Sequence, residues 1–347
     1  MYSPKFTITN KLLKHIGIIE ASKEVIDHAP LLPYYEREFR KDALVRTIHH
    51  GTHIEGNELN LGQAEKIIDG HIVVGRDRDI QEVINYRKVM EYIDELGSRN
   101  YELGITEEMI KKMHTLTVQK ILADEQCGQF RKKQVVVRNN KTGEVTFRPS
   151  DVALVPALVA DLVDFISHPQ DIHPVLKSGL VHYELVRIHP FIDGNGRVAR
   201  ALSTLILFLE GYDIRKFFSL EEYFDSVATQ YYEALQSVEK EKGDLTNWLE
   251  YFTEGLAIEL SKIKDKVEKI SIDGNLKKKL GKQIMLSDRQ LKIIEYIQEA
   301  GYLQNQAFKT LFPMVSEDTI LNELKELLKT KIIKKKGKTK GAKYVMA

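Results

Sequence analysis

A run of twelve residues, HPFIDGNGRVAR from His189 to Arg200, collects groups that can hold a phosphate. Gly194 and Gly196 let the main chain approach a ligand, because glycine carries no Cβ that would stand in the way. Arg197 and Arg200 lie three residues apart, on neighbouring faces of one helical turn, and both can make charge-assisted hydrogen bonds to phosphate oxygens. The spacing of these groups predicts an anion site.

Two further side chains of the same run can carry a reaction. Asp193 supplies a hard oxygen, which suits Mg²⁺ held between the protein and phosphates. His189 stands at the mouth of the loop and can take a proton from an attacking hydroxyl. A phosphate cradle, a metal ion, positive charge and a base are what phosphoryl or nucleotidyl transfer needs. The alternative is a simple helix cap beside a structural histidine, and the density of polar groups between two apolar helices favours an enzyme.

Two helices must hold this loop in place. The residue before a proline is pushed out of the helical region, so the helix LKSGLVHYELVRI is expected to end near His189, just before Pro190. Apolar residues spaced three or four apart then predict a second helix that begins near Asn195 and stops at Gly211. The first N–H groups of that helix have no partners inside it and form a natural anion site.

Helical spacing also dominates the rest of the first 255 residues. Segments such as residues 80–96 and 106–122 place apolar residues three or four apart, and convincing strands are few. One stretch differs, because residues 134–148 alternate around the turn-forming cluster NNKTG and predict a β-hairpin. The expected fold class is therefore mainly α, a helical bundle with one β-hairpin.

The composition changes after residue 260. Residues 256–283 are rich in charged side chains and predict a linker or a helical connector, which leads into a separate domain, residues 284–347. That domain reads as three helices followed by two short strands around a GKTKG turn. This order of elements is typical of a winged helix-turn-helix domain.

Two features of this C-terminal domain point to different partners. Eight lysines and no acids lie between Lys329 and Lys343, a run that can lie along phosphates. The expected recognition helix, residues 316–328, is acidic and has no arginine or glutamine to read base edges. DNA binding is therefore uncertain, and dimerisation or docking of a target protein is an equal alternative.

The whole-chain composition excludes several classes of protein. The 347 residues are 43% hydrophobic with a net charge of +1, so no global charge draws the chain to nucleic acid or membrane. The single cysteine, Cys127, cannot form an internal disulfide. The N-terminal residues do not read as a signal peptide, and the best apolar run is too short to cross a bilayer. A soluble, cytoplasmic protein is expected.

The run from His189 to Arg200 resembles the signature of the Fic family, HPF-x-[DE]-GNGR-x-x-R, with every fixed position present. The resemblance extends over roughly residues 1–255 and implies a helical enzyme that transfers AMP from ATP, with Mg²⁺, to a Ser, Thr or Tyr hydroxyl of a target protein. It implies that His189 deprotonates that hydroxyl, that Asp193 holds Mg²⁺ and that Arg200 grips the terminal phosphate. Phosphate binding falls to the residues between them, which are Gly194, Asn195, Gly196 and Arg197.

Two other segments resemble parts of the same family. The hairpin at residues 134–148 resembles the flap that aligns the main chain of the target beside ATP. Residues 217–235 resemble the region that closes over the adenosine, which makes Tyr231 and Tyr232 candidates for ATP binding. The other interpretation of these two tyrosines, as core aromatics at helical spacing, stays open.

The run HHGTHIEGNELN, residues 49–60, resembles the inhibitory segment of Fic proteins, [ST]-x-x-x-E-[GN]. Glu55 and Gly56 fit this pattern, whereas the position four before Glu55 is Gly51 rather than Ser or Thr. The resemblance implies an ion pair between Glu55 and Arg200 that denies the arginine to the γ-phosphate of ATP. It divides the first 255 residues into an N-terminal helical region with this segment, residues 1–110, and a catalytic core, residues 111–255.

Several alternatives remain open at this point. In some Fic proteins the glutamate equivalent to Glu55 positions water for removal of AMP, and the signature does not choose the nucleotide, so transfer of UMP or phosphocholine is a rival. A nucleotide-binding transcriptional regulator acting through its winged helix is a rival from another class. The three histidines His49, His50 and His53 have metal-ligand spacing, but no acid or cysteine completes an obvious site, and the sequence favours a polar helix face. A homodimer is a plausible assembly.

Overall fold

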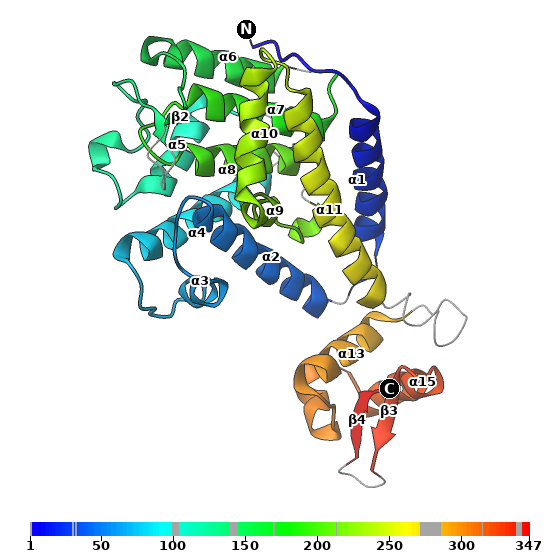
Figure 1. Ribbon diagram of the computed structural model, residues 1–347. Coiled ribbons are helices and arrows are strands. Elements are labelled where there is room, and N and C mark those ends of the chain that lie inside the picture. The colour runs from blue at the N-terminus through cyan, green and yellow to red at the C-terminus, as the bar shows by residue number, and fades with distance from the viewer. Residues whose placement is uncertain are drawn as a thin grey trace. The chain divides into compact units, whose positions relative to one another are not determined.

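The computed structural model describes residues 2–29, 31, 33–98, 104–138, 145–168, 171–212, 214–270, 286–313, 315–337 and 342–347. The chain forms two compact units. The first unit consists of Met1–Asp27 and Arg40–Ile263, and the second consists of His28–Phe39 and Lys264–Ala347. Figure 1 follows the chain from its N-terminus to its C-terminus by colour, and no described helix is long and apolar enough to cross a membrane.

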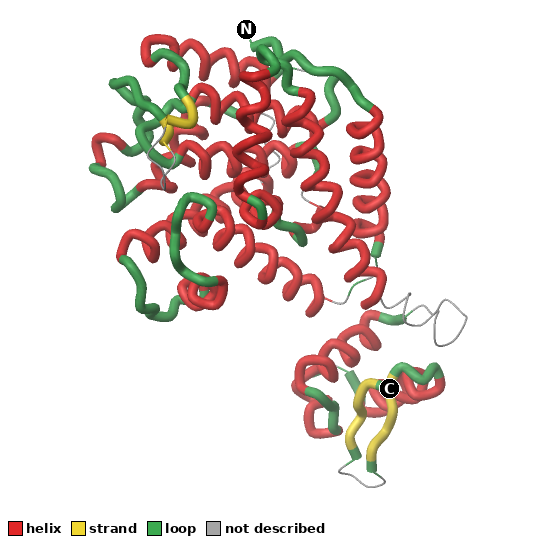
Figure 2. The backbone as a smooth tube through the Cα atoms, viewed as in Figure 1, coloured by secondary structure: helices red, strands yellow, loops and turns green. Residues whose placement is uncertain are grey.

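The first unit is almost entirely helical, as Figure 2 shows, which confirms the expected mainly α class. Short 3₁₀ turns connect some of the helices. The helices, three of which extend past the limits of the unit, are α1 Asn10–His28, α2 Pro33–His53, α3 Leu61–Ile68, α4 Asp77–Ser98, α5 Glu107–Val118, α6 Val155–Ser167, α7 Pro174–Ile188, α8 Asn195–Leu209, α9 Leu220–Ser226, α10 Ala228–Lys240 and α11 Thr246–Ile270.

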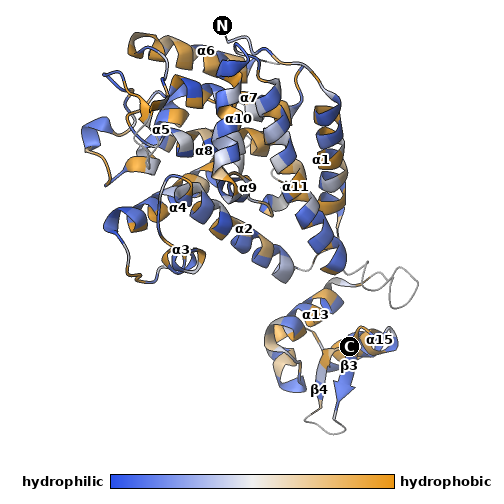
Figure 3. Cartoon of the chain, viewed as in Figure 1, coloured by the Kyte–Doolittle hydropathy of each residue, from blue (hydrophilic) through white to orange (hydrophobic). Residues whose placement is uncertain are grey.

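Helices α7 and α8 pack against each other at the centre of the first unit (Figure 1). Leu180 and Leu185 of α7 and Val198, Leu202 and Leu205 of α8 are fully buried. Burying a leucine or valine side chain contributes roughly 1.5–3 kcal/mol each. The outer helices α1, α2 and α11 alternate between hydrophilic and hydrophobic residues in Figure 3, as expected for helices with one face on a core. The two central helices are therefore a firm support for the loop that joins them.

The predicted hairpin is present as two short strands. Strand β1, Val137–Arg138, pairs antiparallel with β2, Val145–Phe147, and Val137 lies opposite Phe147. The predicted turn falls at residues 139–144, which lie outside the described residues. The described strands are shorter than the alternating run of residues 134–148 from which they were predicted.

The second unit contains α13 Asp288–Ala300, α14 Phe308–Leu311, α15 Glu317–Lys329, and the antiparallel strands β3 Ile333–Lys336 and β4 Lys343–Met346. Ser287 and Gln290 form a capping box at the start of α13. Three helices followed by two strands is the order that the sequence predicts. Apolar residues from all three helices and both strands form one buried cluster, among them Ile297, Phe308, Leu324, Ile333 and Tyr344.

The two units compare with the sequence-based domain limits at two places. Helix α11 continues to Ile270, so residues 256–270, the first part of the expected linker or helical connector, are helical. Residues 271–285 lie outside the described part of the chain. The second unit also takes in His28–Phe39, where Tyr35 packs on its apolar cluster and accepts a hydrogen bond from Gln298 at 3.2 Å. Periodicity along the chain carries no sign of that long-range contact.

Candidate active site

The loop between α7 and α8 has the ends that the sequence predicts. Helix α7 stops at Ile188, and α8 begins at Asn195. His189 takes the left-handed conformation, with φ 53° and ψ 58°, and Gly194 has φ 75°. Left-handed backbone is uncommon for a residue with a side chain, so contacts around His189 must hold it there.

Arg131 provides those contacts. Its Nε donates to the carbonyl oxygen of His189 at 2.8 Å, and its main-chain N–H donates to the carbonyl oxygen of Pro190 at 2.8 Å. The same guanidinium donates to the carbonyl oxygens of Ile188 and Ser150. Hydrogen bonds from a charged donor are stronger than neutral ones. This role could not be predicted from sequence spacing, because Arg131 lies 58 residues before His189.

The side chain of His189 is oriented to accept a proton. Its Nδ1 lies 3.2 Å from the carbonyl oxygen of Val186, so Nδ1 carries the hydrogen and Nε2 is the acceptor. Burial lowers the pKa of His189 below its ordinary value, and the contact with Val186 and the charge of Glu55 offset only part of that shift. A neutral imidazole with an accepting Nε2 is the form that works as a general base.

Asp193 is ionised and fully engaged. Its Oδ1 accepts from the N–H of Gly194 at 2.6 Å and lies 3.4 Å from Nη2 of Arg197, while Oδ2 accepts from Nη2 of Arg78 at 2.8 Å. Burial alone would raise the pKa of Asp193, but Arg197, the N–H of Gly194 and Arg78 together bring it below the ordinary value. The carboxylate therefore carries its charge at neutral pH.

The donor set around Asp193 fits Mg²⁺ only together with a phosphate. No group of three or more His, Cys, Asp or Glu side chains is arranged around a metal position in the described residues. Mg²⁺ commonly binds proteins through one or two carboxylates and completes its shell with substrate phosphates and water. Asp193 can supply that one carboxylate, and the start of α8 can hold the phosphates.

His114 supports the loop through contacts with Asp193 and Phe191, a role that the sequence does not indicate. Its Nδ1 accepts from the N–H of Gly128 at 2.9 Å, so Nε2 carries the hydrogen and donates to the carbonyl oxygen of Asp193 at 3.2 Å. Its ring stacks on Phe191 with 3.9 Å between centroids. Burial lowers the pKa of His114 to about 4, which keeps it neutral.

Asn195 stabilises the loop from within. Its side chain makes two hydrogen bonds of 2.9 Å to the main chain of Phe191.

Arg200 is buried and bonded to the segment around Glu55. Its Nη2 donates to Oε1 of Glu55 at 2.8 Å and to the carbonyl oxygen of Gly51 at 2.8 Å. Burial favours the neutral guanidine, but Glu55 and the nearby Tyr231 and Tyr86 keep the pKa of Arg200 above its ordinary value. The arginine is therefore charged, and the ion pair that the resemblance implies is present in the structure.

Gly196 makes room for that ion pair. A Cβ added at Gly196 would lie 2.3 Å from Oε1 of Glu55 and 3.2 Å from Nη1 of Arg200. Any other residue at this position would have to displace the glutamate. Because Gly196 has no Cβ, the carboxylate of Glu55 can approach its main chain closely, and a phosphate could approach for the same reason.

Two buried arginines have donors without acceptors. Within the described part of the chain, Nε and Nη1 of Arg197 and Nε of Arg200 have no hydrogen-bond partner. Nη1 of Arg197 has only an ion-pair contact of 3.2 Å with Oε1 of Glu82. Buried polar atoms usually find partners, so unpaired guanidinium donors at a helix start suit an anionic ligand.

The two tyrosine candidates lie at one cavity but differ in burial. Tyr231 is fully buried, and its hydroxyl lies 2.9 Å from Nε2 of His182 in a cluster of aromatic rings. Tyr232 is partly exposed, and its hydroxyl donates to the carbonyl oxygen of Ile54 at 3.4 Å. Tyr231 is thus a core aromatic that also borders the cavity, and Tyr232 contacts the segment of residues 49–60.

A cavity of about 140 Å³ is lined by five of the ten predicted site residues. The loop, helix α10 and the hairpin contribute to its walls. The candidate residues that line it are Glu55, His189, Gly196, Tyr231 and Tyr232, joined by Val137 and Phe147 of the hairpin. A larger cavity of about 510 Å³ lies between α2, α4 and α8 and holds none of the predicted site residues.

Residues 49–60, the segment proposed to inhibit, are held by contacts on two sides. His50 and His53 each direct Nδ1 to the carboxylate of Asp225 in α9, at 2.7 and 2.8 Å. The sequence indicated no acid that would complete a site with these histidines, and the fold brings one from 175 residues away. Past the turn, Nδ2 of Asn57 donates to Oε2 of Glu82 at 3.1 Å.

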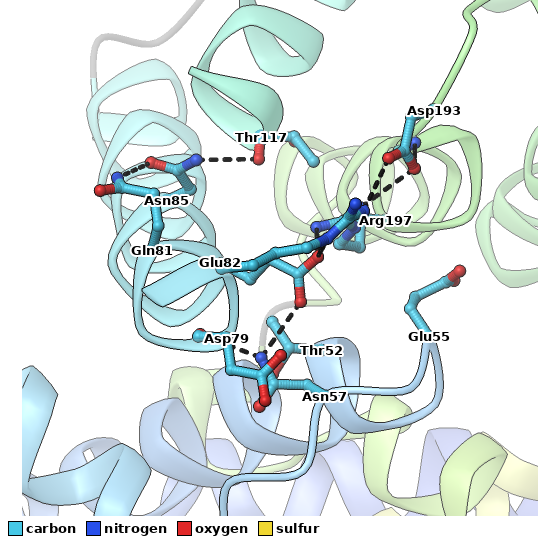
Figure 4. A network of polar contacts seen from close by, with 12 residues as sticks. Thr52, Glu55, Asn57, Asp79, Gln81, Glu82, Asn85, Thr117, Asp193 and Arg197 are labelled. Carbon is cyan, nitrogen blue, oxygen red and sulfur yellow. Dashed lines mark hydrogen bonds and ion pairs between the residues drawn. The ribbon is translucent and has the colours of Figure 1, made fainter. Parts of the chain in front are cut away.

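Glu82 contacts both the segment of residues 49–60 and the first turn of α8, as Figure 4 shows. Its side chain lies between Asn57 on one side and Arg197 on the other, and Arg197 in turn reaches Asp193. Glu82 also accepts from Nε of Arg78 at 3.1 Å. Both Glu82 and Arg78 come from α4, and the sequence did not single out either residue.

The fold and the site together define a helical domain in which a loop at a helix start carries a buried histidine, an ionised aspartate and guanidinium donors without hydrogen-bond partners among the described residues. Residues 104–207 match the Fic/DOC family, so the chain contains a Fic domain. This matched segment includes the whole run from His189 to Arg200 and the hairpin.

Relatives with curated names support the same assignment. The chain is 34% identical over 178 residues to "Protein adenylyltransferase Fic" of Drosophila willistoni and 33% identical over 178 residues to the protein of that name in Drosophila melanogaster. These alignments cover 51% of this chain and 34% and 35% of the two relatives. The chain thus spans about a third of the length of the curated relatives it matches.

Solved structures share the fold. A Fic family protein from Desulfovibrio desulfuricans G20 has a TM-score of 0.69 at 24% identity, with 100% of this chain and 98% of that chain covered. Fic-1 from C. elegans has a TM-score of 0.62 at 24% identity, with 74% and 73% covered. At this level of identity the likeness concerns the fold alone.

Proposed function

We propose that this protein transfers AMP from ATP, with Mg²⁺, to a Ser, Thr or Tyr hydroxyl of a target protein, and that Glu55 inhibits the transfer. One observation carries the proposal. A neutral histidine, an ionised aspartate and a buried, charged arginine lie around the first turn of α8, namely His189, Asp193 and Arg200. The name of the curated relatives supports AMP as the group transferred.

The phosphates of ATP would lie on the start of α8. The main chain of Gly194, Asn195 and Gly196 would donate to them, since the first N–H groups of a helix have no partners within it. The unpaired donors of Arg197 and Arg200 would complete the cradle, with Arg200 on the γ-phosphate. Mg²⁺ on Asp193 would neutralise charge on the leaving phosphates when bound.

The chemical step needs one base. Nε2 of His189 would take the proton of the target hydroxyl as that oxygen bonds to the α-phosphorus of ATP. The bond between the α-phosphorus and the oxygen that bridges to the β-phosphate would break, and pyrophosphate would leave. Strands β1 and β2, which place Val137 and Phe147 in the wall of the cavity, would align the main chain of the target by adding it to a strand edge.

Glu55 would block this reaction by occupying Arg200. Because Oε1 of Glu55 lies 2.8 Å from Nη2 of Arg200, a γ-phosphate cannot bind the same nitrogen. ATP would then bind in a pose whose α-phosphate is not in line with the incoming hydroxyl. A second candidate activity, removal of AMP from a modified protein, follows from one further observation. Glu55 lines the same cavity as His189, so its carboxylate can position a water there.

The second unit would be a winged helix-turn-helix domain, with β3 and β4 as the wing. Exposed lysines on β3 offer a surface for phosphates, whereas α15 has acids in its first turn. We propose that this unit serves dimerisation or docking of the target in a cytoplasmic protein. DNA binding is the competing role, and a gel shift that falls steeply with salt would reveal it.

Label transfer from α-labelled ATP tests the proposed function. The purified protein, its Glu55→Gly variant and a Glu55→Gly/His189→Ala double variant would be incubated with Mg²⁺ and a cell lysate. We expect protein labelling in Glu55→Gly, weaker labelling in the unchanged protein, and none without His189. An absence of label in all three proteins, while γ-labelled ATP still binds, would refute AMP transfer. A parallel assay with labelled UTP would test transfer of UMP, and release of AMP from a pre-AMPylated protein would test AMP removal.

A further inference from the structure

Arg78 forms an ion pair with the oxygen of the Asp193 carboxylate that a metal ion would need. Nη2 of Arg78 lies 2.8 Å from Oδ2 of Asp193, while the other oxygen, Oδ1, already accepts from the N–H of Gly194. Arg78 does not belong to the loop, because 115 residues separate it from Asp193. It is brought there by α4, as the first turn of that helix faces the loop.

The two arginines on Asp193 differ in their freedom to move. The side chain of Arg197 is 2% exposed and is enclosed by the protein, whereas the side chain of Arg78 is 58% exposed. Arg197 is therefore a fixed part of the site. Arg78 can leave Asp193 for solvent at little cost, since ion pairs of exposed side chains are weak.

Arg78 can keep its ion pair with Glu82 after its contact with Asp193 is broken. Nε of Arg78 donates to Oε1 of Glu82 at 3.1 Å, and that carboxylate is 6% exposed. The same Glu82 has an ion-pair contact with Arg197 (Figure 4). The guanidinium is planar and moves as one unit, so a pivot about the contact between Nε and Glu82, taken up by the aliphatic torsions of Arg78, would free Oδ2 of Asp193.

The charges around Asp193 balance without a metal ion. Two carboxylates, Asp193 and Glu82, face two guanidinium groups, Arg78 and Arg197. A divalent cation on Oδ2 would meet the charge of Arg78 on the same oxygen, and the two cannot share it. Phosphates added with the cation would restore the balance, because they carry more negative charge than the cation neutralises.

We propose that Arg78 is the resident counter-ion of Asp193 and that a divalent cation reaches Asp193 only by displacing it. Arg78 is thus a positioning residue that makes metal binding depend on the nucleotide. The proposal rests on the proposed function for the role of the metal, but the competition between two cations for one carboxylate does not require any transfer. Among described arginines, Arg78 and Arg197 are the two that contact Asp193.

Binding of Mn²⁺, followed by the electron paramagnetic resonance signal of the free ion, tests this inference without nucleotide. The variant Arg78→Gln should bind Mn²⁺ at least about threefold more tightly than the unchanged protein, which is the scale of an exposed charge pair. Arg78→Lys should lie between the two, because it keeps a charge but cannot bond Glu82 and Asp193 together. The double variant Arg78→Gln/Asp193→Asn should lose the gain.

Arg76→Gln is the matched control. Arg76 precedes the same helix and is 54% exposed, but it pairs with Asp79 and Glu58 rather than Asp193. We expect its Mn²⁺ affinity to equal that of the unchanged protein. Equal affinities for Arg78→Gln and the unchanged protein, or an equal gain in Arg76→Gln, would overturn the inference. If Arg78→Gln alone gains Mn²⁺ affinity while no protein is labelled from ATP, the result would count against the proposed function but not against this inference.

Discussion

Oε1 of Glu55 lies 2.8 Å from Nη2 of Arg200, although 145 residues separate them in the chain. The pair is possible because three other positions make room or give support. Gly196 leaves space for the carboxylate, Gly51 offers its carbonyl oxygen to the same nitrogen, and Asp225 holds the helix end through two histidines. Two of these positions, Gly51 and Asp225, lead to testable consequences.

Replacing Gly51 by serine should destabilise the protein. Serine would match the family pattern that Gly51 breaks, but an added Cβ would lie 2.5 Å from Cε1 of Tyr86, which is fully buried. Overpacking of this kind costs about 1–3 kcal/mol, so the free energy of unfolding should fall by that amount. Urea unfolding followed by circular dichroism measures it. Gly17→Ser, where a Cβ meets nothing within 4 Å, is the control and should not lose stability; equal values for both variants would contradict the packing argument.

Replacing Asp225 by asparagine should weaken the inhibition. The burial of Asp225 would raise its pKa, but His50 and His53 hold the pKa below the ordinary value, which marks an ionised carboxylate bonded to both histidines. Loss of the charge should weaken the hold on the end of α2 and raise label transfer by roughly twofold to tenfold, which corresponds to the net worth of one ordinary hydrogen bond, about 0.5–1.5 kcal/mol.

A double variant separates this effect from general damage. In a protein that already carries Glu55→Gly, Asp225→Asn should add no further activity, because the inhibitory carboxylate is gone. Initial rates of label transfer for the four proteins give the comparison. An equal increase with and without Glu55 would show that Asp225 acts elsewhere than on the inhibitory segment.

The pH dependence of transfer should reflect His189. The base must be neutral, and burial lowers its folded pKa below the ordinary 6.5, so activity is kept as the pH falls toward about 6.5 and is lost only below it. Removing Glu55 takes away a charge that raises this pKa, so the Glu55→Gly variant should hold its activity to a still lower pH. Initial rates between about pH 5 and 9 at saturating ATP measure the profile. A decline that begins between pH 8 and 7 would contradict the assignment.

His114 should matter for both stability and catalysis. The variant His114→Phe can keep the stacking on Phe191, but it leaves the N–H of Gly128 and the carbonyl oxygen of Asp193 without partners. An unsatisfied buried group costs about 1–3 kcal/mol, which should lower the free energy of unfolding, and the displaced loop should lower kcat. His71→Phe, at an exposed position, is the control. A stable His114→Phe with unchanged kcat would show that the loop keeps its shape unaided.

Local rules predicted the parts of the site that lie within one run of sequence. Pro190 ends α7, glycine permits the left-handed turn at Gly194, and apolar spacing starts α8 at Asn195, so both helix ends could be placed from neighbouring residues. The strands of the hairpin followed from alternation for the same reason. The pairing of Glu55 with Arg200 came from resemblance, because no rule of spacing connects residues so far apart.

The sequence by itself determined the loop between α7 and α8 and placed on it His189 and Asp193, the proposed base and metal ligand, because these depend on residue types within twelve positions. Only the tertiary structure decided which side chains surround them. Arg131 reaches His189, His114 reaches Asp193, and Arg78 reaches Asp193 across separations of 58, 79 and 115 residues. Contacts of this kind arise when buried helix faces pack and bring distant polar side chains together, and neither the period of a helix nor the chemistry of a single run contains that information.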